Sequence, residues 1–176
     1  SMNLSNKRKL VFVLVILSFF VLSGLPGCSK EAKKAKHWKR GEQFFSENKF
    51  KEAIIEYKNV LQLDPKDATC RYKLGLSHLR AGQFREAFTE FSKSVELNQG
   101  LVDARLQLGN FYLLSRDSQK AREQAERILE KDPNNSSGHL LMSSVYMTEK
   151  DPDKAVSEAK KAIEKDPKNI DAYLQL

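Results

Sequence analysis

Apolar and polar positions from residue 34 onward form short helical runs separated by polar breaks. Within residues 102–135, apolar side chains recur at helical spacing up to Leu114. The polar break Ser115-Arg116-Asp117 then precedes a second amphipathic run over residues 121–129. Two such runs joined by a short break are typical of a helical hairpin. The pattern therefore predicts an all-α chain built from pairs of antiparallel helices.

Asp-Pro pairs mark the expected helix boundaries. Proline lacks the amide donor that a helix needs and biases the preceding residue away from helical angles. Asp64-Pro65, Asp132-Pro133 and Asp166-Pro167 each follow a second amphipathic run, so they predict helix ends. Asp151-Pro152 precedes such a run, so it predicts a helix start with Asp as N-cap and Pro at the first helical position.

Small and aromatic residues recur with a period of 34 residues. Alanine is invariant at one position of the period, and a small residue and large packing residues keep step with it. The four series are Ala53, Ala87, Ala121 and Ala155; Gly41, Gly75, Gly109 and Ser143; Phe44, His78, Tyr112 and Tyr146; and Tyr57, Phe91, Ala125 and Ala159. We expect the small residues to lie where the two helices of one hairpin approach closely.

A 34-residue period of paired helices resembles the tetratricopeptide repeat (TPR) family. The resemblance implies a right-handed superhelical solenoid of helix-turn-helix repeats. Its repeats cover residues 34–67, 68–101, 102–135 and 136–169, and residues 170–176 begin a truncated fifth repeat. The family's first-helix tryptophan position holds His37, Arg71, Arg105 and His139 here. We expect these groups to be exposed and to loosen the contact within each hairpin.

The same resemblance implies a concave groove lined by the first helix of each repeat. The family's ligand-contacting positions are largely apolar in this chain, and they predict a groove for an amphipathic helix or an extended apolar peptide. The candidate groove residues are Trp38, Phe45, Tyr72, Leu76, Leu79, Arg80, Leu106, Asn110, Leu113 and Met147. The alternative is that the aromatic positions pack between repeats. The family's clamp for chaperone C-terminal tails is not expected, because its Lys and Asn are replaced by Trp38 and Glu42.

The N-terminal region has the order of a secretory signal. Lys7-Arg8-Lys9 precede an apolar run over residues 10–22, which is shorter than the roughly 20 residues that span a bilayer. Leu25-Pro26-Gly27-Cys28 follows and resembles the lipobox of bacterial lipoproteins. The alternative is an uncleaved N-terminal anchor with an incidental cysteine.

The lipobox resemblance implies a signal peptide over residues 1–27, lipidation of Cys28 and a short tether over residues 28–33. Lipid chains would hold the protein on the membrane. We expect an envelope location facing the periplasm, and Ser29 after the cysteine favours the outer membrane in this family. The basic residues near this tether suit either an anionic lipid surface or a solubilising linker.

Composition changes this picture little. Of the net charge of +7, three charges precede the apolar run, which leaves 7 − 3 = +4 for the rest, so a nucleic-acid partner is not expected. The two cysteines, Cys28 and Cys70, are too few for a disulfide framework, and Cys70 is expected to be a small buried residue. No catalytic motif or spaced metal ligands occur, so we expect no enzyme, cofactor or metal.

The sequence predicts a lipid-anchored protein-interaction scaffold that supports assembly of an export, polysaccharide or pilus system. The alternative is a membrane-docked accessory that regulates an envelope polysaccharide synthase or a peptidoglycan hydrolase. Repeat arrays normally close with a polar capping helix. Because the fifth repeat stops within its first helix, we also expect self-association through the uncapped C-terminal end.

Overall fold

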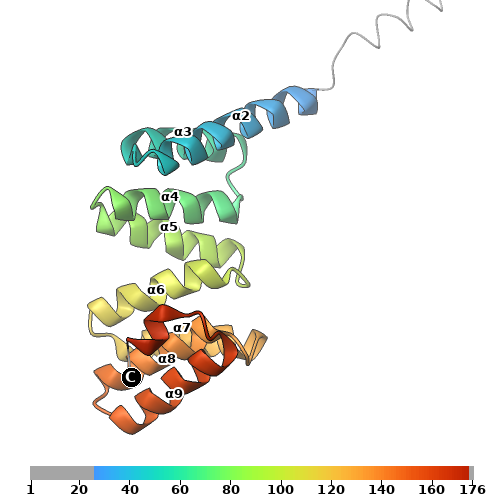
Figure 1. Cartoon of the computed structure of the whole chain (residues 1–176). Coiled ribbons are helices and arrows are strands. Elements are labelled where there is room, and N and C mark those ends of the chain that lie inside the picture. The colour runs from blue at the N-terminus through green and yellow to red at the C-terminus, as the bar shows by residue number, and fades with distance from the viewer. Residues whose placement is uncertain (1–25, 175–176) are drawn as a thin grey trace, which may run out of the picture.

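The computed structural model describes residues 26–174, with side chains from residue 29 onward, and all regular structure in this part of the chain is helical. The helices form four successive antiparallel hairpins followed by a short helix (Figure 1). The elements are α2 (Pro26–Ser46), α3 (Phe50–Leu63), α4 (Ala68–Arg80), α5 (Phe84–Leu97), α6 (Val102–Leu114), α7 (Ser118–Lys131), α8 (Ser136–Thr148), α9 (Pro152–Lys165) and α10 (Ile170–Tyr173). This arrangement confirms the predicted all-α solenoid.

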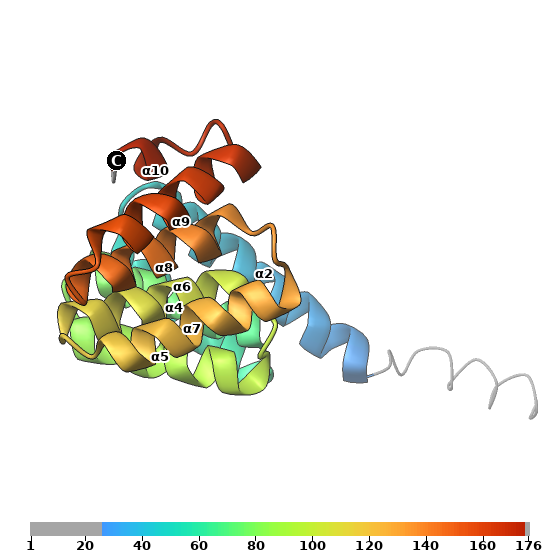
Figure 2. The same cartoon turned by 90° about the horizontal axis from the view of Figure 1, so that it is seen from below.

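The hairpins stack in chain order, from α2 and α3 at one end to α8 and α9 at the other (Figure 1). The short helix α10 packs on α9, next to the last hairpin (Figure 2). Residues 28–33, the predicted tether, are helical and belong to α2. The first helix is therefore 21 residues long, whereas α4, α6 and α8 each have 13 residues.

Helix boundaries follow the predicted capping chemistry. Asp64, Asp132 and Asp166 are the C-caps of α3, α7 and α9, each directly before a proline. Asp151 caps the N-terminus of α9 through its side chain, which accepts a hydrogen bond from the Lys154 amide, and proline follows at the first turn. Asn98 ends α5 with nearly the same backbone angles although Gln99 replaces the proline, so proline is not required for this turn.

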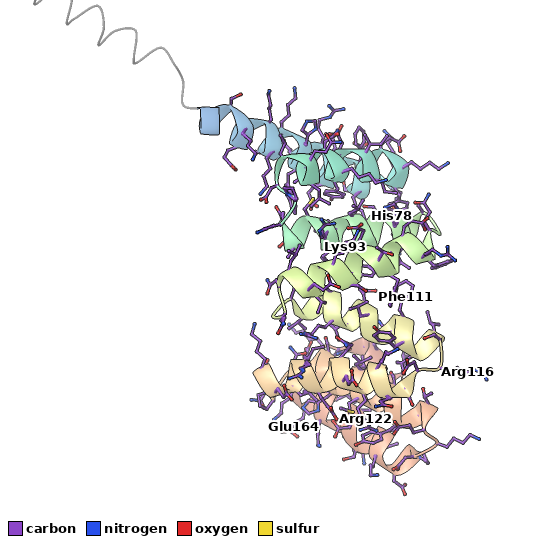
Figure 3. All side chains as sticks on the ribbon, turned by 180° about the vertical axis from the view of Figure 1, so that it is seen from behind. His78, Lys93, Phe111, Arg116, Arg122 and Glu164 are labelled. Atoms are coloured by element: carbon purple, nitrogen blue, oxygen red, sulfur yellow. The ribbon has the colours of Figure 1, made fainter. Side chains whose placement is uncertain are left out.

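Three hydrophobic clusters run along the stack. The first joins hairpin α2–α3 to α4 and includes Tyr57 and Cys70, the second centres on Phe91, and the third joins α7 to α8 around Ile128 and Leu141. All four period alanines are completely buried, which confirms the register of the repeat. Phe111 of α6 lies between the second and third hairpins, against the rings of Phe88 and Phe91 (Figure 3).

The glycines of the first two repeats confirm the predicted close approach within a hairpin. A Cβ atom added to Gly41 would lie 2.8 Å from the Tyr57 ring, and one added to Gly75 would lie 2.7 Å from the Phe91 ring. Both rings belong to the second helix of the same hairpin. A Cβ atom on Gly109 would instead meet Leu141 of the next repeat at 2.5 Å. The expectation that Gly109 contacts its own hairpin is therefore wrong.

Residues at the family's tryptophan position connect the two helices of each hairpin, so the prediction that they loosen this contact is wrong. Their side chains meet a residue 19 positions later, on the second helix. The pairs are His37 Nδ1 with Glu56 Oε2 at 2.6 Å, Arg71 Nη1 with Glu90 Oε2 at 2.9 Å, Arg105 Nη1 with Gln124 Oε1 at 3.0 Å, and His139 Nδ1 with Glu158 Oε2 at 2.6 Å.

The same residues also reach back to the preceding turn in the last three repeats. Arg71, Arg105 and His139 meet the backbone carbonyl oxygens of Pro65, Gln99 and Pro133 at 2.7 to 3.0 Å. Arg105 and His139 are each only 8 % exposed, contrary to the expectation of exposed groups. Burial of these polar groups is tolerated because they have hydrogen-bond partners.

Candidate partner-binding groove

The first helices of the repeats border a hollow toward each end of the stack. The C-terminal hollow has a volume of about 460 Å³ and lies between α6, α8 and α10. The N-terminal hollow has a volume of about 440 Å³ and lies between α2 and the start of α4. Both volumes fall in the range of small-ligand or side-chain pockets. The groove that the family resemblance implies is therefore hollowed at separate places.

The C-terminal hollow combines apolar and polar groups. Leu106, Leu140, Leu141 and Leu174 supply the apolar part of its lining. The polar part consists of Gln107, Asn110, Ser137, Ser144 and Asp171. The Ser144 hydroxyl is engaged with the backbone, since its Oγ donates to the Leu140 carbonyl at 3.2 Å. This hollow is more polar than the apolar groove that the sequence pattern predicts.

The N-terminal hollow is bounded by Trp38 and by a tight ion pair. Its lining comprises Glu31, Lys34, Ala35, Trp38, Asp67 and Thr69. Lys34 Nζ lies 2.6 Å from Asp64 Oδ2 and 3.0 Å from Asp67 Oδ2. Hydrogen bonds to these two carboxylates raise the pKa of Lys34, so the ammonium stays charged. Asp67 also caps α4 by accepting a hydrogen bond from the Cys70 amide at 2.8 Å.

A second polar contact joins the first two hairpins beside this hollow. Glu42 accepts hydrogen bonds from the Tyr57 hydroxyl and from Lys73 Nζ, the latter at 2.9 Å. Burial and the bond to Glu42 raise the pKa of Tyr57 above its usual range. Lys73 also lies 6.0 Å from the centre of the Phe45 ring. Glu42 therefore has a structural role at a position where the family often contacts ligands.

Three of the predicted groove residues line a hollow: Trp38 in the N-terminal one, and Leu106 and Asn110 in the C-terminal one. The other seven line neither. Arg80 is exposed and Met147 is 54 % exposed, so both remain accessible. The remaining five pack half-buried against core clusters or neighbouring rings, and they are Phe45, Tyr72, Leu76, Leu79 and Leu113. The role of all ten in binding stays a prediction.

Several lining residues were not among the candidates. Gln107 and Leu141 lie next to family contact positions, at Leu106 and Leu140, and helical geometry turns them toward the same hollow. Asp171 of α10 and Leu174, the residue directly after α10, follow the fourth repeat. The sequence signal for both was that residues 170–176 begin the first helix of a fifth repeat. The first helix of each repeat borders the groove, and this helix does so as well.

The candidate reactive groups are separated. Cys70 is completely buried as expected, its thiol donates to the Tyr57 carbonyl at 3.4 Å, and burial raises its pKa to about 12. His37, His78 and His139 lie in different repeats and have separate partners, which for His78 is Gln83 Oε1 at 2.6 Å. Within residues 26–174, no group of three metal-ligating side chains converges.

The structure does not test the predicted membrane attachment. Among the helices it describes, none has the length and apolar character to cross a bilayer. The apolar run 10–22 lies outside the described residues, as do the rest of the predicted signal segment up to residue 25 and the side chain of Cys28.

Comparison with protein-family models gives three adjacent matches. A model described as "TPR repeat" matches residues 41–82, and models described as "Tetratricopeptide repeat" match residues 78–145 and 137–169. Together these matches cover all of the hairpins except the start of α2. No curated protein matches the chain.

Solved structures show the same fold. A crystal structure of MamA protein is 24 % identical, with a TM-score of 0.70 over 81 % of this chain and 78 % of that one. A further MamA crystal structure is 26 % identical, with a TM-score of 0.67 over 77 % of this chain and 79 % of that one. PilF of Pseudomonas aeruginosa is 14 % identical, with a TM-score of 0.72 over 84 % of this chain and 67 % of that one. With its 34-residue period, its stacked hairpins and these matches, the chain belongs to the tetratricopeptide repeat family.

Proposed function

We propose that the chain is a non-enzymatic scaffold that binds a protein segment in its groove while its N-terminal region holds it at a bacterial envelope membrane. The observation that carries the binding proposal is the C-terminal hollow between α6, α8 and α10. Leucines of α6 and α8, with Leu174 directly after α10, supply apolar lining, and Asn110, Gln107 and Asp171 supply polar groups. An amphipathic helix or extended segment satisfies both kinds of surface.

The chemistry of the lining supports binding without catalysis. Asp171 is the one acidic group of the C-terminal hollow as described, and no histidine or cysteine lines either hollow. General acid–base or nucleophilic catalysis needs at least one activated group facing the substrate. Binding a protein segment needs only a complementary shape, apolar area and hydrogen bonds, and the lining supplies apolar and polar groups.

Membrane attachment is supported by the sequence before residue 29. The basic head, the apolar run 10–22 and the lipobox-like segment ending at Cys28 favour a lipidated protein that faces the periplasm, in the outer membrane by the Ser29 criterion. In that setting, the scaffold would support assembly of an export, polysaccharide or pilus system. An accessory that docks a polysaccharide synthase or peptidoglycan hydrolase is the second candidate, and the identity of the bound partner distinguishes the two.

A matched pair of variants in the third repeat tests the groove. Asn110→Arg adds a bulky cation at the exposed edge of the C-terminal hollow, and Gln119→Arg adds the same group to an exposed site on α7 outside both hollows. The full chain is crosslinked and purified from its own envelope, and the co-purifying proteins are quantified. We expect Asn110→Arg to lose a partner that Gln119→Arg retains. Equal recovery with both variants would contradict the groove as the binding surface.

A further inference from the structure

Helix α2 carries a dense run of basic residues. Between residues 30 and 40 it contains Lys30, Lys33, Lys34, Lys36, Lys39 and Arg40, against the single acid Glu31. The helix begins before the first hairpin, and its first turns project beyond α3 and away from the other hairpins (Figures 1 and 2). These turns present charge where no other element covers it.

Two of these cations are neutralised within the fold. Lys34 pairs with Asp64 and Asp67, and Arg40 Nη2 lies 2.9 Å from Glu56 Oε1. Lys33, Lys36 and Lys39 are exposed and make no ion pair or hydrogen bond with any described residue. Structural pairing therefore explains part of the basic run and leaves a second part without a role in the fold.

Lys30 is exposed and unpaired as well, and three of these four unpaired lysines share one side of α2. At 100° per residue, Lys33, Lys36 and Lys39 fall within about 120° of the helix circumference. The buried Gly41 lies on the opposite side, where α2 packs against Tyr57 of α3. Trp38, which faces the N-terminal hollow, is also opposite the lysines, about 160° from Lys36 around the helix. The lysine side is thus separate from both the hairpin core and the groove.

We propose that this lysine face of α2 lies on the surface of an anionic lipid bilayer. A row of flexible, strongly hydrated ammonium groups along one exposed helix side complements a plane of anionic headgroups. The lysine face begins at Lys33, shortly after the apolar run 10–22 and Cys28 in the chain, which brings the face close to the membrane. The inference rests on the membrane attachment in the proposed function. It adds an orientation: the groove side of α2, with Trp38, points away from the headgroups and stays open to a partner.

A charge-matched pair of triple variants tests this surface. Lys33→Gln, Lys36→Gln and Lys39→Gln together remove the face, whereas Lys150→Gln, Lys160→Gln and Lys168→Gln remove the same charge from exposed, unpaired lysines of the last repeat. Glutamine has nearly the same helix propensity as lysine, so α2 is retained. Circular dichroism checks that both variants keep the helical content of the full chain.

The measurement is flotation of the full chain with vesicles at limiting lipid, where part of the protein stays unbound. Vesicles of phosphatidylcholine alone are compared with vesicles that also contain phosphatidylglycerol. We expect the preference for the anionic vesicles to fall about 10- to 100-fold in the α2 variant and to change little in the matched control. We also expect added salt to weaken the wild-type preference, because it screens exposed charges.

Each arm isolates one part of the inference. If both triple variants lost the preference for anionic vesicles equally, or if the wild-type chain showed no such preference, the lysine face would not be the surface that binds anionic lipid. If the lysine face bound an anionic polymer such as DNA but gave no preference for anionic vesicles, the lipid bilayer would not be its partner. Binding to neutral vesicles reports on the N-terminal attachment alone, so its absence would count against the proposed function and is distinguishable from failure of the lysine face.

Discussion

In hairpins α2–α3 and α4–α5, a ring from the second helix covers the glycine of the first, Tyr57 over Gly41 and Phe91 over Gly75. In the next two hairpins the ring positions hold Ala125 and Ala159. Leu141 of the following repeat fills the space at Gly109. Ser143 replaces the glycine in the last hairpin and donates a hydrogen bond to the Ala155 carbonyl at 2.8 Å.

This difference shows that the same repeat geometry can fill its core in two ways, with an aromatic ring from its own second helix or with a side chain from the next repeat. In the first half of the stack, each hairpin fills its own interior with an aromatic side chain. In the second half, α8 has six buried residues, and one of them, Leu141, fills space in the neighbouring repeat. Since interiors are packed to constant density, the small side chain at residue 125 has to be compensated from elsewhere. We infer that repeats three and four are coupled more strongly than repeats one and two.

The largest expected effect comes from emptying an aromatic site. Phe91→Ala removes a completely buried ring that contacts Tyr72, Phe111 and Gly75, and we expect it to lower the free energy of unfolding by about 3–5 kcal/mol. Phe84→Ala on the same helix is the control, because Phe84 is 60 % exposed and its loss should cost less than about 0.5 kcal/mol. Urea denaturation of both variants checks this, and similar midpoints would contradict the packing role of Phe91.

Ala125→Phe tests the comparison directly by giving the third hairpin the ring of the first two. Because Leu141 already occupies that space, we expect a loss of about 1–3 kcal/mol from overpacking. The double variant Ala125→Phe with Leu141→Ala should recover part of this loss. A double-mutant cycle by urea denaturation measures the coupling. Strictly additive losses would mean that the two side chains do not share one space.

Adding one methyl group to each glycine gives a smaller contrast. Gly75→Ala would place Cβ 2.7 Å from two atoms of the buried Phe91 ring, which has no free space to move into. Gly109→Ala would press on the terminal methyl groups of Leu141, which turn more easily. Alanine favours the helix by about 1 kcal/mol at both sites. Thermal unfolding should therefore show Gly75→Ala destabilised and Gly109→Ala close to wild type. The reverse order would contradict the conclusion that the Phe91 ring fills the space at Gly75 and Leu141 fills the space at Gly109.

The smallest expected effect is pH-dependent and belongs to the last hairpin. Burial opposes ionisation of Glu158, but hydrogen bonds from Lys161 and His139 outweigh it and lower its pKa below 4.5. A lowered folded-state pKa means that the carboxylate stabilises the fold above about pH 4.5 and that this contribution disappears as the pH falls through the folded pKa.

We therefore expect Glu158→Gln to be less stable than the wild type at neutral pH by about 1 kcal/mol or less. The difference should vanish in acid, where the wild-type carboxyl is also protonated. Denaturant midpoints measured across this pH range check the expectation. A difference that stays constant with pH would show that the side chain acts through packing rather than charge.

Much of the fold was predictable because it follows from the sequence period and from the backbone chemistry of neighbouring residues. The alanines at residues 53, 87, 121 and 155 revealed the period, and all four are buried. The Asp-Pro pairs fixed helix ends through backbone chemistry that depends only on neighbouring residues. The site was less predictable: Trp38, Leu106 and Asn110 line hollows, but Tyr72 and Leu79 pack against the core cluster around Phe91.

The polar contacts within the hairpins show why the rest was not predictable. Arg105 and His139 look like surface residues in the sequence, and their burial depends on an acceptor 19 residues later and a carbonyl six residues earlier. Such pairings are decided by side-chain reach across two helices, and no local pattern encodes them.

By itself, the sequence determined the helical repeat, its register and the boundaries of its helices, because these follow from periodic burial and from capping residues that act locally. Only the tertiary structure decided which side chain fills each glycine site, which basic residues of α2 are paired, and where the groove is hollowed. These features depend on volumes and charges contributed by helices that are distant in the chain, so they arise only when the hairpins are stacked.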